Sequence, residues 1–186
     1  MTLYRDLLAD VAAARRERGR VTPFLFPHIF SVAAFRVAHA MGVRGASVSA
    51  RLVSVLATIM TGAEIDWQAQ IGPGLFLSHP VGVVIGPGVK IGSDVFVGAG
   101  VLLGSTYGES RRHPTSGFPT IADRARILAK ASVIGPVTVG VDAAVGAHAL
   151  VLSDVPPGTI ARGVPARCYL SGRELPFTGE NSGRQP

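Results

Sequence analysis

The stretch that decides the fold reads Ile85-Gly-Pro-Gly-Val-Lys-Ile91-Gly-Ser-Asp-Val-Phe-Val97-Gly-Ala-Gly-Val-Leu-Leu103. An aliphatic residue recurs at every sixth position, and a small or β-branched residue follows it four places later. The first positions of this repeat along the chain are Ile65, Ile71, Leu77, Ile85, Ile91, Val97, Leu103, Ile121, Ile127, Val133, Val139, Val145 and Val151. The second positions are Ala69, Leu75, Val81, Val89, Val95, Val101, Ala125, Ala131, Val137, Ala143, Ala149 and Val155. A short fixed period is typical of a parallel β-helix, whereas sandwich strands recur at roughly 8–12 residues.

The period has a direct physical interpretation. Three short sides form one triangular coil, and each side pairs with the same side of the next coil. The first aliphatic residue of each repeat points into the prism, where equivalent positions stack into a continuous core. Gly and Asp at the corners tolerate the turn backbone. We therefore predict a mainly β chain, with a parallel β-helix over residues 63–170.

Residues 1–62 lack the six-residue period and predict a short α-helical domain. One helix is expected to end at Gly19, before the breakers Pro23 and Pro27. Two more are expected over residues 28–41 and 47–60, where apolar residues recur at helical spacing. The simplest interpretation is a cap over the open end of the β-helix. A second interpretation adds an assembly surface on the same helices.

The repeat is interrupted once, over residues 105–120. This segment is polar and rich in turn residues, and a long excursion from a regular solenoid is usually functional. The last segment, residues 171–186, is rich in Gly, Pro and charge and is predicted to be a flexible tail.

Composition narrows the classes of function. The 186 residues are 47% hydrophobic and 16% charged, which indicates a well-packed globular protein. The net charge of +6 favours an anionic ligand, but no nucleic-acid-binding motif appears, and a phosphate-bearing co-substrate explains the excess equally well. The single cysteine, Cys168, excludes a disulfide framework, and no cluster of metal ligands is apparent. No signal peptide or membrane span is recognised, so we expect a cytoplasmic protein.

Several motifs are similar to those of the serine O-acetyltransferases, members of the hexapeptide-repeat acyltransferase superfamily. They are Thr61-Gly-Ala-Glu-Ile-Asp66, Ile71-Gly-Pro-Gly-Leu-Phe-Leu-Ser-His79, Gly82-Val-Val-Ile-Gly86, Leu103-Gly-Ser-Thr106, Arg112-His-Pro114 and Gly163-Val-Pro-Ala-Arg167. The match runs from about residue 32 to residue 167. The resemblance implies a left-handed coil, acetyl-CoA as co-substrate, a hydroxyl acceptor and a place in cysteine biosynthesis.

The chemistry of acetyl transfer agrees with the histidines in these motifs. Attack of a hydroxyl on a thioester needs a base for the hydroxyl proton, and a neutral imidazole suits this at ordinary pH. The resemblance makes His79 the base and Glu64, where the family has an aspartate, the carboxylate that orients it. It makes His113 a second active-site histidine that binds or orients the acceptor. We expect His28 and His39, on helices among apolar residues, to be structural, and His148 to face solvent without a functional motif.

The acceptor site departs from the family pattern. The family carries an aspartate before the catalytic histidine, which helps to bind the serine ammonium, and here that residue is Ser78. A second substrate aspartate of the family has no match in residues 20–27. The expected substrate-binding residues are Ser78, Asp66, Arg112 and His113.

The resemblance also locates the acetyl-CoA site. Family members hold the co-substrate in a cleft between neighbouring prisms of a trimer, largely through backbone amides of small residues. The matching positions are Gly104, Ser105, Ala129 and Ala147, with Lys130 and Arg167 as candidates for the phosphates. We therefore expect a homotrimer, with a dimer of trimers as the alternative, and no nucleic-acid or membrane partner.

Two other functions stay open at this point. Loss of the two aspartates favours an O-acetyltransferase for a sugar or a secondary metabolite. A non-catalytic β-helix, serving as a scaffold or a binding module, is the alternative of another class. His79 and His113 argue against the scaffold, because the fold needs histidine at neither position.

Overall fold

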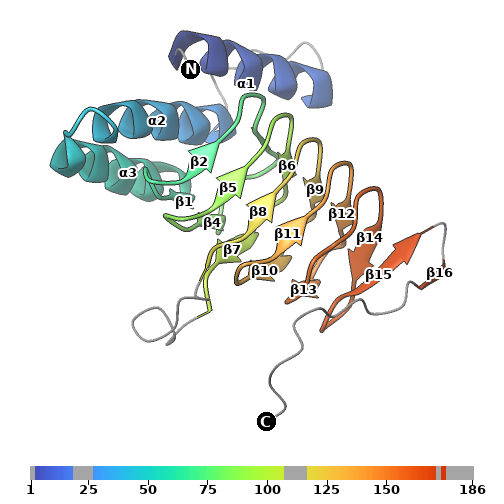
Figure 1. Ribbon diagram of the computed structural model, residues 1–186. Coiled ribbons are helices and arrows are strands. Elements are labelled where there is room, and N and C mark those ends of the chain that lie inside the picture. Colours follow the sequence, from blue (N-terminus) through green and yellow to red (C-terminus); the bar gives the residue numbers. More distant parts are fainter. Residues whose placement is uncertain (1–2, 19–26, 107–116, 171–172, 175–186) are drawn as a thin grey trace.

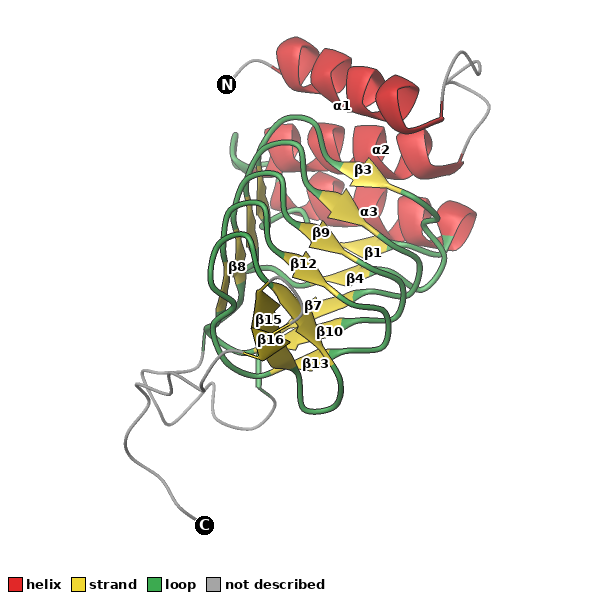
Figure 2. Ribbon diagram, turned by 90° about the vertical axis from the view of Figure 1, so that its right-hand side faces the viewer, coloured by secondary structure: helices red, strands yellow, loops and turns green. Residues whose placement is uncertain are grey.

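The computed structural model describes residues 3–18, 27–106, 117–170 and 173–174. Three helices come first, and a parallel β-helix of five coils follows them (Figure 1). The helices are α1 (Leu3–Arg18), α2 (Pro27–Gly42) and α3 (Ser47–Thr61). Helices α2 and α3 pack on each other at one end of the β-helix, and α1 lies over α2 (Figure 2). His113 and Arg112 lie outside the described residues, as does most of the predicted tail.

Three sheets form the sides of the prism. The first sheet contains β1 (Glu64–Ile65), β4 (Val84–Ile85), β7 (Leu102–Gly104), β10 (Ser132–Ile134) and β13 (Leu150–Val151). The second contains β2 (Gln70–Ile71), β5 (Lys90–Ile91), β8 (Thr120–Ile121) and β11 (Thr138–Val139). The third contains β3 (Phe76–Leu77), β6 (Phe96–Val97), β9 (Arg126–Ile127), β12 (Ala144–Val145), β14 (Ile160–Arg162), β15 (Arg167–Leu170) and β16 (Arg173–Glu174). All pairs between coils are parallel, and β15 and β16 close the third sheet with antiparallel pairing.

The predicted inward positions form the core. Every first position of the repeat, from Ile65 to Val151, is at most 5% exposed. Equivalent residues stack in register, as Ile85 does on Ile65 and Leu103 does on Ile85. A strand of two residues cannot hold itself together, so each coil depends on its neighbours for both hydrogen bonds and apolar contacts.

One second position of the repeat departs from the others, which are buried. Val81 is 69% exposed, and Val83 occupies the inward position instead, with 0% exposure. The cause is the spacing from Leu77 to Ile85, which is eight positions where the uninterrupted repeat uses six. Two extra residues therefore enlarge the turn between β3 and β4 and shift the inward position along the chain.

A buried ion pair fixes the helices onto the first coil. The Arg36 guanidinium on α2 donates from Nε and Nη2 to the two carboxylate oxygens of Asp10 on α1, at 2.9 and 3.1 Å. It also donates to the backbone carbonyls of Ile71 and Gly72, at 2.5 and 2.6 Å. One side chain thus joins both helices to the second sheet.

Asp10 extends this network to the next turn of the coil. Its Oδ1 accepts hydrogen bonds from the amides of Gly74 and Leu75, both at 2.9 Å. Burial raises the pKa of Asp10 above its ordinary value, while Arg36 and the two amides act in the opposite direction. Asp10 and Arg36 therefore form a buried charge pair in which both side chains make further hydrogen bonds to the backbone of the first coil.

We expect Asp10→Ala to lower the free energy of unfolding by about 3–5 kcal/mol, because it leaves Arg36 buried without its charge partner. Urea unfolding at a fixed protein concentration measures the change. Arg16→Ala is the control, since Arg16 and its partner Asp94 are both exposed and their pair contributes at most about 1 kcal/mol. Equal losses in the two variants would show that the buried pair does not hold the helices in place.

Candidate active site

His79 lies in the enlarged turn between β3 and β4, where the chain passes from the third sheet to the first. We call this edge of the prism the His79 corner. Strand β3 positions the turn firmly, because Leu77 points into the core and Phe76 is buried against α1 and α2. Backbone bonds hold the turn to its neighbours, with the Ser78 amide donating to the Val97 carbonyl at 2.8 Å. The imidazole of His79 is exposed at the end of this rigid segment.

Glu64 lies at the same corner, one coil earlier. It begins β1, directly after the segment that leads out of α3. The Gly82 amide donates to the Gly62 carbonyl at 2.8 Å, so the turn that carries His79 stacks on the residues preceding Glu64. Both side chains are exposed, and within the described part of the chain no hydrogen bond or ion pair joins them. The backbone thus brings the two predicted residues to one corner, and their pairing remains a prediction.

Asp66 has structural partners. Its Oδ1 accepts the Gln68 amide at 2.9 Å, which stabilises the turn between β1 and β2. Its Oδ2 lies 3.4 Å from Nη1 of Arg51 on α3. A role for Asp66 in acceptor binding would have to coexist with these contacts. Ser78 is half-buried beside His79.

The predicted acetyl-CoA positions fall on two different edges of the first sheet. Ala129, Lys130 and Ala147 are exposed at the His79 corner. Lys130 there has a left-handed backbone, φ 58°, and its amide donates to the Ala99 carbonyl at 2.7 Å. Gly104 and Ser105 lie at the opposite edge, where β7 ends at Gly104. We call that edge the loop corner.

Arg167 is exposed in β15, at the far end of the coil from the helices. The three histidines to which no catalytic role was assigned are also described. His28 is buried with its ring against Phe76, at a centroid distance of 5.7 Å. His39 bonds the Trp67 carbonyl through Nδ1 at 2.8 Å, and His148 is exposed at the His79 corner.

Sequence reasoning missed the anchor of the loop corner. The Phe118 ring lies over the Gly86-Pro87-Gly88 turn, where a Cβ on Gly88 would stand 2.1 Å from Cδ2 of that ring. Gly117 also packs closely on Pro136 of the next coil, whose Cβ would stand 2.7 Å from a Cβ on Gly117. Only glycine admits these contacts, so the returning end of the excursion is clamped between two coils. The signal was the pair of glycines around Pro87, which the repeat alone does not require.

The described residues lack a metal-binding cluster and a membrane-spanning helix. They contain no group of three or more His, Cys, Asp and Glu side chains that could hold a metal ion. Among the helices that the structure describes, none is long and apolar enough to cross a membrane.

The sequence has relatives of known name across nearly its whole length. No protein-family model matches it. The serine acetyltransferase of Helicobacter pylori strain J99 is 42% identical over 173 residues, which cover 92% of this chain and 96% of that protein. The serine acetyltransferase of Mycobacterium tuberculosis is 38% identical over 177 residues, which cover 91% of this chain and 74% of that protein.

Solved structures of serine acetyltransferases also resemble this chain. Soybean serine acetyltransferase superposes with a TM-score of 0.82 at 32% identity, covering 90% of this chain and 69% of that one. The Neisseria gonorrhoeae serine acetyltransferase in complex with serine superposes with a TM-score of 0.81 at 28% identity, covering 89% of this chain and 68% of that one. A serine acetyltransferase in complex with CoA superposes with a TM-score of 0.81 at 26% identity, covering 90% of this chain and 70% of that one.

A five-coil β-helix with an exposed histidine at one corner and a long excursion at another defines a hexapeptide-repeat acyltransferase. Within that class, the chain belongs to the serine acetyltransferase family. Members of this family are left-handed β-helix proteins and acetyl-CoA-dependent enzymes, so the predicted handedness and enzyme class are confirmed.

Proposed function

We propose that this chain transfers the acetyl group of acetyl-CoA to the hydroxyl of L-serine, as a cytoplasmic homotrimer, and thereby serves cysteine biosynthesis. The observation that carries the proposal is the His79 corner, where the predicted base, the predicted orienting carboxylate and three predicted acetyl-CoA positions meet on one edge. The relatives named serine acetyltransferase, and the neighbours holding serine and CoA, support the same reaction.

The proposed reaction uses the imidazole of His79 as a general base. His79 accepts the hydroxyl proton as the serine oxygen attacks the thioester carbonyl, and a tetrahedral intermediate forms. The carbon–sulfur bond then breaks, and the imidazolium returns the proton to the departing CoA sulfur. Glu64, at the same corner, would orient the ring and stabilise its charge during the step. His113 and Arg112, outside the described residues, would bind and orient the acceptor.

Acetyl-CoA would lie against the small residues of both corners. Ala129 and Ala147 expose methyl groups at the His79 corner, and Gly104 adds no side chain at the loop corner. Such positions let a pantetheine arm approach the backbone amides closely. Lys130 and Arg167 would meet the phosphates.

The division of these positions supports a trimer. One prism cannot bring its own loop corner to its own His79 corner, because the first sheet separates them. A neighbouring prism can, so a complete site needs two subunits. The outer face of α3, which leads directly into the first sheet, is also apolar, with Val48, Leu52 and Ile59 at least 59% exposed. Burial of that face between subunits is favourable.

Ser78 supports a second candidate, an acceptor without an ammonium group. A serine hydroxyl beside His79 supplies no negative charge, where the family resemblance expects a carboxylate. An uncharged hydroxyl compound would not miss that carboxylate. Serine remains the first choice because the relatives match over the whole site region.

His79→Ala should lower kcat by about 10²–10⁴-fold, the usual contribution of a general base. Release of free CoA thiol with L-serine as acceptor measures the loss, and circular dichroism checks the fold. Glu64→Gln should lower kcat less, since it removes the orienting charge but leaves the base. Near-normal kcat in a folded His79→Ala protein would contradict the assignment.

Ser78→Asp separates the two acceptor classes. If the native site lacks a carboxylate for the ammonium, the variant should raise kcat/KM for L-serine by about tenfold, since an added charge–ammonium hydrogen bond is worth roughly 1.5–3 kcal/mol. The same assay with an uncharged alcohol is the control, where no gain is expected. Should the uncharged alcohol be the better wild-type acceptor, while the variant leaves serine turnover unchanged, serine is not the substrate.

If two subunits share each active site, two inactive variants should complement each other in mixed trimers. Co-expression of His79→Ala with His113→Ala should restore about a quarter of the wild-type activity, because one site in four of a randomly mixed trimer takes both intact residues from different subunits. Each variant expressed alone is the control. Mixed trimers without recovered activity would place both histidines of a site in one subunit.

A further inference from the structure

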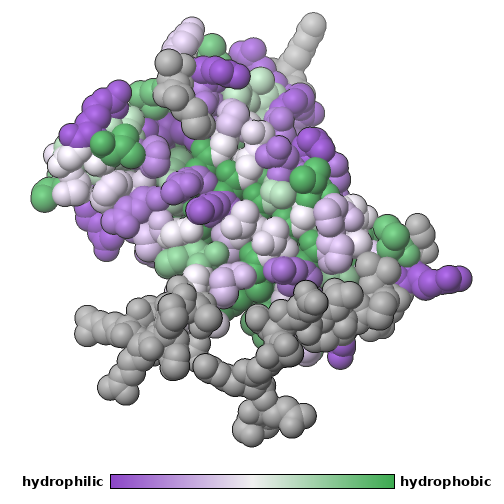
Figure 3. Space-filling model, viewed as in Figure 1, coloured by the Kyte–Doolittle hydropathy of each residue, from purple (hydrophilic) through white to green (hydrophobic). Residues whose placement is uncertain are grey.

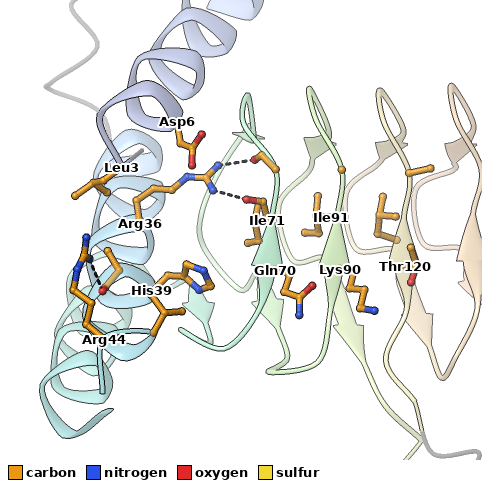
Figure 4. A pocket seen from close by; sticks show the side chains of 16 residues that line it. Leu3, Asp6, Arg36, His39, Arg44, Gln70, Ile71, Lys90, Ile91 and Thr120 are labelled. Atoms are coloured by element: carbon orange, nitrogen blue, oxygen red, sulfur yellow. Dashed lines mark hydrogen bonds between the residues drawn. The ribbon is translucent and has the colours of Figure 1, made fainter. Parts of the chain in front are cut away.

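A cavity of about 820 Å³ lies where α1 and α2 meet the second sheet, apart from the His79 corner. Its floor is the outer face of β2, β5 and β8, and the helices form its wall (Figure 4). On this side of the molecule, hydrophilic and hydrophobic residues alternate over the junction of helices and sheet (Figure 3). The charged side chains and the imidazole in its lining are Asp6, Arg36, His39, Arg44 and Lys90.

Asp6 is a largely buried residue whose carboxylate lines the cavity. It is only 7% exposed, and the described part of the chain offers it no hydrogen bond or ion pair. The nearby Arg36 does not neutralise it, because that guanidinium is already paired with Asp10 and bonded to two carbonyls. The Asp6 carboxylate is therefore open to the cavity and has no partner among the described residues.

His39 adds a neutral acceptor to the same cavity. Its Nδ1 lies 2.8 Å from the Trp67 carbonyl, which can only accept, so Nδ1 carries the proton. In the neutral ring Nε2 is then an acceptor. Figure 4 shows the ring directed from α2 towards Gln70 on the sheet side of the cavity. An ammonium group would find both Asp6 and this nitrogen on the cavity wall.

Lys90 provides the opposite charge on the floor. It begins β5, its side chain is exposed, and it has no ion pair within the described residues. Between the two charges the lining includes Leu3 and the side-chain-free backbone of Gly72 and Gly92. The helix wall carries Asp6 together with Arg36, which is paired with Asp10, and Arg44, which donates to the Ala40 carbonyl, while the sheet floor carries Lys90.

We propose that this cavity binds a small elongated zwitterion, with its ammonium group at Asp6 and its carboxylate at Lys90. The carboxylate of Asp6 gains the partner that the fold withholds, and the ligand's methylene chain covers the Gly72 and Gly92 floor. The site is separate from the acetyl-transfer corner and does not depend on that reaction.

The test uses three probes of equal length: ω-aminohexanoate, hexylamine and hexanoate. Isothermal titration calorimetry with the full chain should show ω-aminohexanoate binding more tightly than either single-charge probe. Asp6→Asn should weaken ω-aminohexanoate and hexylamine by at least about tenfold, and Lys90→Gln should reduce ω-aminohexanoate to the level of hexylamine. Glu17→Gln, a half-exposed carboxylate elsewhere on α1, is the matched control and should change nothing.

Stability gives a second measurement. Asp6→Asn should leave the thermal midpoint unchanged or raise it without ligand, since it removes a carboxylate that has no partner among the described residues. A lower midpoint would show that Asp6 serves Arg36 instead of a ligand, and would overturn the proposal. So would binding of no probe, or equal affinities in wild type and Lys90→Gln, a surface change that leaves the fold intact. None of these outcomes bears on acetyl transfer, which is assayed separately.

Discussion

The vertical stacking of aliphatic residues inside the prism is the constraint on which the remaining structure depends. Most strands are only two residues long, so no coil is stable alone. Ile65, Ile85, Leu103, Val133 and Val151 continue one column through all five coils of the first sheet. Insertions are tolerated only at corners, where they leave this column intact. Chemistry is therefore confined to the corners.

Both irregularities of the repeat fall at the candidate site. Two extra residues enlarge the turn that presents His79, and the long excursion leaves from the opposite edge of the same sheet. Each is held by close backbone packing: the His79 turn stacks on Gly62, and Phe118 clamps the excursion onto Gly86 and Gly88. A rigid solenoid with two anchored irregularities positions reactive groups without a deep pocket in one subunit. This geometry explains why the proposed site needs a neighbour.

The helices do more than close the open end. The Asp10–Arg36 pair bonds α1 and α2 to the backbone of the first coil at four points beyond the pair itself. That attachment fixes the wall of the cavity beside the second sheet and holds Asp6 against it. The sequence alone does not reveal this pair, because pairing between residues 26 positions apart leaves no local pattern.

The sequence by itself determined the coil, because a period of six specifies which residue faces inward whatever surrounds it. It also determined the helical segments and singled out His79 and Glu64 through family motifs. The inward place of Val83 instead of Val81, the Phe118 clamp, the Asp10–Arg36 pair and the lone Asp6 carboxylate were decided only by the tertiary structure. Each depends on contacts between coils or between helix and coil, and such contacts follow from distance in space, which spacing along the chain does not encode.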